Sequence, residues 1–503
     1  MDFMRYAGFL LLAAGLMPPA GCTTVDPATD YDRVEQFASE ATGVGEVYRP
    51  EREAGVGEIV TGLLADGLTV DEAARICLIN NPTLQAGFME LGMARADFVQ
   101  AGLFSNPYVG ISARLPDGGG LANIESGIAQ NIAEIWQIPV RKAAAARALD
   151  RAVIELAREA ADLAALAKGA YYAAVGADER LEIARENATV AQELLDLTVA
   201  RQQAGAANEL DVNLSRNIAL DGEIAVERSR LEAGDARRSL ATVLGLVSRA
   251  GDLVLIDRLF VANSKLRDEA FVVTLAKERR LDIRAARLAV GEAEARLREE
   301  YRSIFPVVEI GLELERADRR RQGGRDVLAD TVRSSIANGR FSVPEIQAPS
   351  ARRSAGEQDT ILGPSLGFEL PLFDQNQAQI AKAEYALEQA RKALDALDRS
   401  VTQEVLGVLD RARTAWTLMA LYRDRSVPLA RSGLELSRES YRAGQATFLS
   451  VLEAQRSYLA ARTGYVDAAQ AAAIAVPELE RSVGVPILSL TTVDSGERSG
   501  NPE

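Results

Sequence analysis

The sequence predicts a mixed α and β fold built from two copies of one structural unit, each joining two short strands to a hairpin of long helices. Segments 200–212 and 440–451 both contain a helix end that carries an arginine, an Ala-Gly pair and a restart into a new apolar-periodic helix. A long helical run precedes each segment, and two short alternating stretches precede each run. Similar segments that recur in the same order along the chain are typical of a repeated structural unit.

The composition excludes several classes of protein. The 503 residues are 26% charged and 48% hydrophobic, which fits neither a disordered chain nor a polytopic helical membrane protein. The net charge of −15 argues against a nucleic-acid partner, since phosphate contacts need clustered Lys and Arg, and is compatible with the passage of cations. The chain has no histidine and no convergent acid/base pair. We therefore expect no enzyme, no cofactor and no metal site.

The N-terminus predicts export. Residues 1–21 read as a signal peptide, with Arg5 before an apolar core and small residues before Cys22. The sequence Pro19-Ala20-Gly21-Cys22 resembles the site at which bacterial lipoproteins are cleaved and acylated, with Pro19 where an aliphatic residue is usual. An ordinary signal peptide with a chance cysteine is the alternative. Residues 22–60 are polar and interrupted by Gly and Pro, which predicts an extended, lipidated tether.

The two copies are expected to span residues 61–262 and 263–484, followed by a flexible tail, 485–503. Each copy opens with a helix; in the first, Thr69 and Glu72 form a capping box and Asn81-Pro82 predicts a break. The expected strand hairpins cover 107–135 and 306–373, and the expected helical hairpins cover 140–246 and 374–483. Pro139 and Pro371 are expected to begin the long helices.

The strands of the second copy alternate well. Val308, Ile310, Leu312 and Leu314 are expected on one face. The carboxylates expected on the other, polar face are Glu309, Glu313, Glu315 and Glu369. The segment 124–135 alternates poorly and is predicted as a strand chiefly because its counterpart in the second copy is one.

The long helices carry apolar, mostly small residues at alternating four- and three-residue steps from Leu149 to Leu195. This spacing predicts a coiled-coil seam. Gly205 and Gly444 are expected to end the first helix of each hairpin, since glycine allows the positive φ that a reversal of the chain direction needs.

Four strands of about ten residues are long enough to cross an outer membrane, but the smallest bacterial barrels use about eight. Open strand edges are not tolerated in lipid. If these strands span a bilayer, the chain must therefore oligomerise, and three copies would supply twelve strands.

Together these features resemble the TolC family of outer-membrane efflux factors. The turn Tyr441–Gly444 is one of the features that carry the resemblance, and the most specific match is Gly363–Leu366 followed by Leu370–Gln375. The resemblance is nearest to the lipoprotein branch that serves resistance-nodulation-division pumps, including heavy-metal efflux systems. It implies a homotrimer with a twelve-stranded β-barrel in the outer membrane of a Gram-negative bacterium, continued by a long periplasmic α-helical barrel. It also implies a passive channel that receives substrates from an inner-membrane pump through a periplasmic adaptor.

The resemblance also assigns residues at the helical tip. Arg201, Gly205, Arg442 and Gly444 are expected at the tip turns that meet the adaptor.

The family's tip can carry rings of acidic residues that gate the channel and favour cations. The positions that correspond are Asp211, Ser450 and Glu453. A solvated helix face is the alternative for each of them. For the whole chain, the alternative is a lipid-anchored periplasmic coiled-coil scaffold or adaptor without a barrel. The substrate cannot be read from the sequence.

Overall fold

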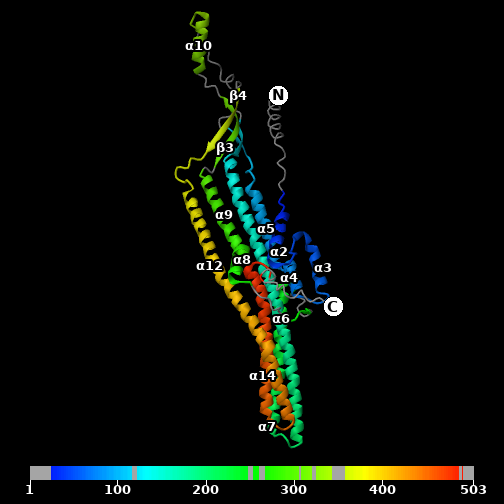
Figure 1. The fold of residues 1–503 in the computed structure, drawn as a ribbon. Helices are drawn as coiled ribbons and strands as arrows, with labels where there is room; N and C mark the ends of the chain where they lie inside the picture. Colours follow the sequence, from blue (N-terminus) through cyan, green and yellow to red (C-terminus); the bar gives the residue numbers. More distant parts are fainter. Residues whose placement is uncertain are drawn as a thin grey trace, which may run out of the picture. The chain divides into compact units, whose positions relative to one another are not determined.

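The computed structural model describes residues 24–115, 122–246, 253–259, 267–304, 307–319, 325–341, 357–486 and 490 (Figure 1). Its contacts divide the chain into two compact units. We call them the helical unit (Met1–Phe98, Ala146–Glu292 and Glu388–Glu503) and the sheet unit (Val99–Ala145 and Ala293–Leu387). No helix among the described residues is both long enough and apolar enough to cross a membrane.

The strands form one antiparallel sheet in the order β1-β2-β3-β4. Their bounds are Tyr108–Arg114, Asn123–Asn131, Val308–Arg319 and Glu357–Phe368. The poorly alternating segment of the first copy is thus a strand, β2. It pairs with β1 on one side and with β3 of the second copy on the other. One sheet therefore joins the strand hairpins of both copies.

The helices repeat in the same order in both copies. In the first copy they are α4 (Val70–Asn80), α5 (Pro82–Ala101), α6 (Glu134–Gln203) and α7 (Glu209–Val243). In the second they are α8 (Glu269–Arg279), α9 (Leu281–Arg302), α12 (Gln377–Leu421), α13 (Val427–Arg442) and α14 (Phe448–Val483). A π-helical segment, Tyr422–Ser426, separates α12 from α13. The sheet unit also contains α10 (Arg325–Asn338), between β3 and β4.

Two expectations about α4 and α6 have different outcomes. The capping box before α4 is confirmed, because the Thr69 hydroxyl accepts the Glu72 amide and the Glu72 carboxylate accepts the Thr69 amide. The predicted start of α6 at 140 is wrong, because the helix begins at Glu134 and contains Pro139. Contacts made by Glu134 explain the early start: its carboxylate accepts the Ser105 amide at 2.8 Å, and Glu134 is buried.

The expected tether is also corrected. Residues 24–63 contain α2 (Ala28–Thr42), the 3₁₀ turn Pro50–Arg52 and α3 (Glu53–Leu63). Tyr31 and Tyr48 are buried and both pack edge-on against Phe88 of α5, with ring centroids 5.3 and 5.7 Å apart. The segment is therefore part of the core of the helical unit. Cys22, the signal segment 1–21 and the tail beyond residue 490 lie outside the described residues.

The core of the helical unit follows the predicted seam of α6. Val153, Ala160, Ala167 and Ala174 are fully buried. Alanine at these positions lets neighbouring helices approach closely, which larger side chains would prevent. Cys77 is buried in the same core, and burial raises the pKa of its thiol to about 12, so it acts as a small packing residue.

Candidate functional site: the two faces of the sheet and the helical tip

The register of the sheet sorts its side chains into two chemically different faces. Residues paired directly across strands point to the same side. Val109 pairs with Ile128, Ile128 with Leu312, and Ile310 with Leu366. These side chains form an apolar face, and all of them are exposed in the single chain, from 42% to 65%. An exposed apolar patch of this kind marks a surface that is covered by lipid or by another protein.

The opposite face is acidic and lined by very small residues. Glu309, Glu313 and Glu315 of β3 lie on it and are exposed, as predicted from the alternation. Glu313 stands in a cross-strand row with Gly127 and Gly363. The fourth predicted carboxylate, Glu369, follows the end of β4 and donates its backbone amide to the Val307 carbonyl. Small neighbours leave the Glu313 side chain unshielded, which suits a wide polar lumen.

One acidic residue of this face was missed. Glu125 of β2 lies directly opposite Glu315 of β3, and like charges at such a pair are destabilising. Arg114 of β1 forms an ion pair with Glu125 at 3.0 Å and offsets that repulsion. The signal in the sequence was weak because β2 alternates poorly, so its faces could not be assigned without the register.

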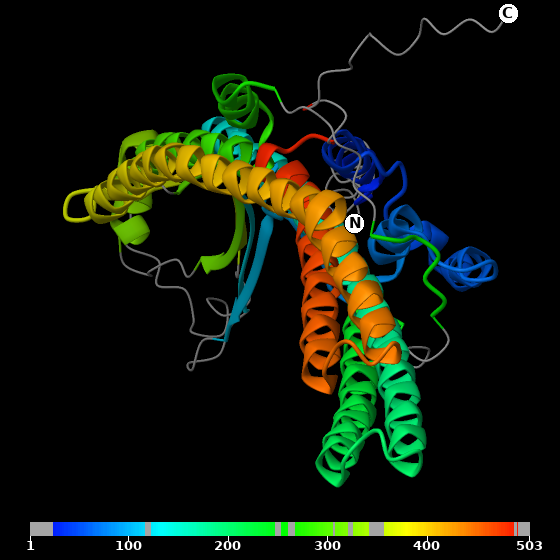
Figure 2. The same cartoon turned by 60° about the horizontal axis from the view of Figure 1, so that its bottom comes forward.

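At the tip, both glycine turns have the same backbone geometry. Gly205 and Gly444 adopt φ of +75° and +73°. In each turn the amide after the glycine bonds to the carbonyl five residues earlier, Ala206 to Arg201 and Gln445 to Ser440. This is the Schellman motif, which ends helices at a left-handed residue. The two hairpins, α6–α7 and α13–α14, end at these turns (Figure 2).

The two tip arginines differ in what they contact. Arg201 donates from Nη1 to the Tyr441 carbonyl at 2.6 Å, and its guanidinium carbon lies 4.3 Å from the centre of the Tyr441 ring. Tyr441 is buried and packs edge-on against Phe448. Arg201 therefore joins the hairpin of the first copy to that of the second. Arg442 is exposed.

The structure gives two of the three predicted gate residues a local role at helix starts. Asp211 lies at the third position of α7 and forms a capping box with Asn208. Ser450 occupies the same position in α14, where its amide bonds to the Thr447 hydroxyl and its own hydroxyl donates to the Thr447 carbonyl. Glu453 is exposed on the next turn. Asp211 and Ser450 are thus structurally equivalent, and both stabilise the start of a returning helix.

Comparison with known proteins finds a family model that is similar to part of the chain. Residues 272–485 match the profile described as "Outer membrane efflux protein". That segment is similar to the outer membrane efflux proteins. The match extends from the start of α8 to the end of α14 and so covers the second copy.

Curated relatives and solved structures extend the similarity to the rest of the chain. The pyoverdine export outer membrane protein OpmQ of Pseudomonas putida is 24% identical over 315 residues, which cover 63% of this chain and 59% of that protein. The matched part thus spans less than two thirds of the relative's length. The structure of the outer-membrane channel OprN covers 89% of this chain and 95% of its own at 19% identity, with a TM-score of 0.62. The structure of VceC of Vibrio cholerae covers 83% of this chain and 96% of its own at 16% identity, with a TM-score of 0.62. The chain has the TolC-like fold.

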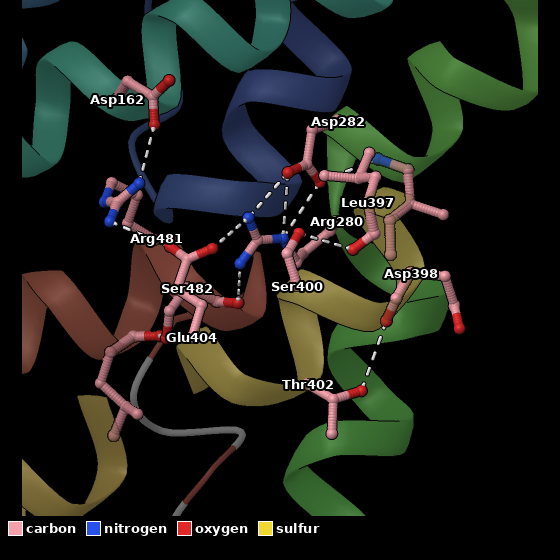
Figure 3. Close-up of polar contacts among 12 residues, drawn as sticks. Asp162, Arg280, Asp282, Leu397, Asp398, Ser400, Thr402, Glu404, Arg481 and Ser482 are labelled. Atoms are coloured by element: carbon pink, nitrogen blue, oxygen red, sulfur yellow. Dashed lines mark hydrogen bonds and ion pairs between the residues drawn. The ribbon is translucent and has the colours of Figure 1, made fainter. Parts of the chain in front are cut away.

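The segment matched by the family model also contains a buried polar cluster that the sequence did not reveal. Arg280 separates α8 from α9 and is only 7% exposed. It donates to the Asp282 carboxylate at 2.7 Å, to Glu404 of α12 at 2.9 Å and to the Ser482 carbonyl of α14 at 2.8 Å (Figure 3). One guanidinium thereby ties four helices together.

Charges of both signs surround this cluster. Arg481 pairs with Glu404 at 3.2 Å and with Asp162 at 3.8 Å, and Lys168 pairs with Glu480 at 3.0 Å. Burial alone would raise the pKa of Asp282, but its hydrogen bonds to Arg280 and the charge of Arg280 outweigh burial and lower it. Burial raises the pKa of Asp162 against the charges of Arg158 and Arg481. The groups border a cavity of about 130 Å³. Among the described residues no three His, Cys, Asp or Glu are placed to hold a metal ion.

Proposed function

We propose that this chain is the outer-membrane channel component of a tripartite efflux system. In this proposal three copies form a closed conduit that passively conducts substrates from an inner-membrane pump and a periplasmic adaptor to the exterior. The observation that carries the proposal is the sheet: one face is apolar and exposed, and the other is lined by carboxylates and glycines.

The edges of this sheet support oligomerisation. β1 and β4 are its outer strands, and each has one side unpaired in the single chain. In lipid, the unsatisfied amides and carbonyls of such edges are strongly unfavourable. Pairing β4 of one copy with β1 of the next removes all edges when a ring closes. Three copies give twelve strands, within the range of bacterial outer-membrane barrels.

The helices of the helical unit support the same ring. Side-chain contacts connect α7 to α6 (Arg237 with Asp178), α6 to α14 (Arg180 with Asp467), and α14 to α12 (Trp416 with the Ala472 carbonyl). Neighbours in this series are antiparallel, and α7 and α12–α13 are its outer members. Both outer members carry exposed apolar rows: Leu220, Ile224 and Leu231 on α7, and Leu418, Leu429 and Leu436 on α12–α13. An α7 row packed on the α13 row of the next copy would continue the antiparallel order and bury both.

The tip is proposed as the adaptor contact and the gate. Arg201 holds Tyr441, so the two hairpins of one chain are joined where the conduit would narrow. Binding of an adaptor that competes for this contact would separate the hairpins and widen the opening. Asp211 and Glu453 would become rings of three carboxylates that favour cations. A pump of the resistance-nodulation-division type and an acyl anchor on Cys22 complete the proposal, and both rest on the sequence resemblance.

Conductance of the purified protein tests the function directly. We expect detergent-extracted trimers to give small, stable channels in planar bilayers, and Arg201→Ala to raise the conductance severalfold. Arg442→Ala is the matched control, because Arg442 is exposed at the other turn, and it should leave the conductance unchanged. A monomer without channel activity would contradict the proposal and favour the lipid-anchored scaffold.

A further inference from the structure

Two carboxylates that border the cavity beside Arg280 have opposite surroundings. Asp282 of α9 accepts hydrogen bonds from Nε and Nη2 of Arg280 and from the Ile283 amide, at 3.0, 2.7 and 2.8 Å. Asp162 of α6 accepts no hydrogen bond from the described residues, and Nη1 of Arg481 on α14 lies 3.8 Å from its Oδ1 (Figure 3). Because 3.8 Å is too long for a hydrogen bond, ionised Asp162 is held by charge alone.

Most of the other charged groups on the cavity are paired with one another. Among the described residues that border it, the cations are Arg158, Lys168, Arg280 and Arg481, and the carboxylates besides Asp162 are Asp282, Glu404 and Glu480. Lys168 pairs with Glu480, and Arg280 pairs with both Asp282 and Glu404. The helix α2 adds only uncharged side chains to this cavity. Two cations therefore remain for Asp162, namely Arg158 and Arg481.

These two cations are poor partners for Asp162. Arg481 also pairs with Glu404, at the shorter distance of 3.2 Å. Arg158 is exposed one turn earlier on the same helix, where solvent screens its charge. Partial burial consequently outweighs both cations and raises the pKa of Asp162, and the charge of Asp282 adds to this increase.

Solvent can deliver protons to Asp162. Its side chain is 43% exposed, and the cavity of about 130 Å³ lies beside it. One water molecule needs about 10–15 Å³ of such space, so the cavity has room for several. Ala161, Ala164 and Ala165 of α6 leave this room because their side chains are short. Asp162 is thus a titratable group that reaches water at the contact between α6 and α14.

We propose that Asp162 is a proton sensor, which takes up a proton in acid and thereby tightens the joint between α6 and α14. The neutral carboxyl group no longer repels Asp282 and no longer competes with Glu404 for Arg481. Both helices run from this joint to the tip turns, over roughly 60 Å along α6 at 1.5 Å per residue. In the proposed channel a tighter joint would favour the narrow state of the tip, and this consequence rests on the proposed function.

The raised pKa fixes the sign of the effect on stability. Protonated Asp162 stabilises the folded state fully below the ordinary value of 3.8, and this stabilisation is lost as the pH rises through the raised pKa. Ionised Asp162 therefore costs stability at neutral pH. Asparagine has nearly the same shape and stays neutral, so Asp162→Asn should remove this cost.

Thermal unfolding of the full-length protein, from neutral pH into acid, tests the sensor. Asp162→Asn should unfold about 1–2 °C above the unsubstituted protein at neutral pH, and the gap should close in acid. Asp282→Asn should unfold below the unsubstituted protein at neutral pH, because its hydrogen bonds favour the ionised carboxylate. Asp97→Asn, at an exposed position on α5, is the matched control and should have no effect at any pH.

A second background separates proton uptake from a merely structural role of Asp162. Arg481→Gln removes a cation that favours the ionised carboxylate. In that background the gain from Asp162→Asn should be larger at neutral pH and should begin to close at a higher pH. A structural role would leave the pH at which the gap closes unchanged.

Conductance of trimers in planar bilayers tests whether the sensor acts on the channel. The ratio of the conductance of the unsubstituted protein to that of Asp162→Asn should exceed one at neutral pH and fall to one in acid. The ratio cancels the titration of the other carboxylates, because both proteins share them.

The contrary outcomes are distinguishable. A loss of stability in Asp162→Asn at neutral pH, or a gain that does not depend on pH, would overturn the sensor. A conductance ratio of one at every pH, together with the expected unfolding data, would overturn its action on the tip. Trimers without any conductance would contradict the proposed function, while the unfolding data would still decide whether Asp162 takes up the proton.

Discussion

In both copies of the repeat, a side chain just before the second helix binds the end of a returning helix, but the two side chains differ in chemistry. In the first copy Asn81 precedes α5, and its amide donates to the Val243 carbonyl of α7 at 2.8 Å. In the second copy Arg280 precedes α9 and donates to the Ser482 carbonyl of α14 at 2.8 Å. A neutral, short side chain and a charged, long one thus bind equivalent helix ends. The charged version also needs Asp282 and Glu404 as counterions, because an unpaired buried charge is strongly unfavourable.

The long helices differ in the same way. In the first copy α6 runs unbroken through 70 residues, whereas in the second a π-helical segment divides α12 from α13. The ring of Tyr422 in that segment packs on Gly464 of α14. In the first copy Gly222 of α7 lies against the Ala188 backbone of α6. Both hairpins thus use a glycine for close approach, to backbone in the first copy and to an aromatic ring in the second.

The largest expected effect comes from the buried guanidinium. Arg280→Ala leaves Asp282 and Glu404 without their partner and should destabilise the protein by about 3–5 kcal/mol. The equivalent change in the first copy, Asn81→Ala, should cost about 1–3 kcal/mol, since it leaves only neutral groups unpaired. Urea unfolding of both variants, followed by circular dichroism, measures the difference. Equal losses would show that charge plays no special part in the second copy.

The next effect tests the two glycine contacts. Alanine at Gly464 would place its Cβ 2.7 Å from the Tyr422 ring, so Gly464→Ala should destabilise by about 1–3 kcal/mol. Gly169 of α6 has open space around its Cα, and Gly169→Ala should stabilise by about 0.5–1 kcal/mol through the unfolded state. Thermal unfolding of the two variants should therefore shift in opposite directions. An unchanged stability of Gly464→Ala would mean that the Tyr422 ring can move away without cost.

Smaller effects are expected at the caps of the returning helices. Asn208→Ala and Thr447→Ala each remove a side-chain acceptor at the start of α7 or α14, at a cost of about 0.5–2 kcal/mol. Because the Asn208 side chain accepts the Asp211 amide at 2.8 Å, whereas the Thr447 hydroxyl accepts the Ser450 amide at 3.4 Å, the loss at Asn208 should be the greater. Hydrogen exchange of amides 209–212 and 448–451 reports each cap separately. Faster exchange after Thr447→Ala than after Asn208→Ala would reverse the expected order.

The smallest expected effect on stability appears only at acidic pH and involves Asp282. The pKa of Asp282 in the folded protein is lowered below its ordinary value of 3.8. Ionisation of this carboxyl group therefore stabilises the folded state relative to the unfolded state. The stabilisation is complete above pH 4 to 5 and is lost as the pH falls through the lowered pKa. The stability difference between the protein and Asp282→Asn should accordingly be constant at neutral pH and shrink in acid. A difference that grows in acid would contradict the assigned pairing with Arg280.

Local patterns in the sequence were sufficient for much of the fold. The capping box at Thr69, the break at Asn81-Pro82, the glycine turns and the alternation of β3 all depend on residues close in sequence, and each is present in the structure. The errors involve distant contacts. The segment after Cys22 was taken as a tether because its Gly and Pro hid the helical spacing of Tyr31, Val34 and Ala38. These side chains become buried only in the core of the folded helical unit.

The candidate site was predicted in part for the same reason. Alternation placed Glu309, Glu313 and Glu315 on one face, but Glu125 needed the register of β2. Both tip arginines were given one role, although Arg201 stands four residues before its glycine and Arg442 only two. The importance of Arg280 could have been inferred from its alignment with Asn81, since Leu281 and Pro82 begin equivalent helices. Its partners Glu404 and Ser482 could not, because they come from distant segments, whereas Asp282 is only two residues away.

The ring of copies is tested most directly by joining the free edges of the helical units. Leu220 lies 15 residues after Gly205, and Leu429 lies 15 residues before Gly444, so both stand at the same height above the tip turns. In a chain carrying Leu220→Cys and Leu429→Cys, mild oxidation should produce covalent dimers and trimers and no larger species, whereas either single variant should yield no trimer. Chains that stay monomeric after oxidation, or that form an open-ended ladder, would contradict the closed three-copy conduit.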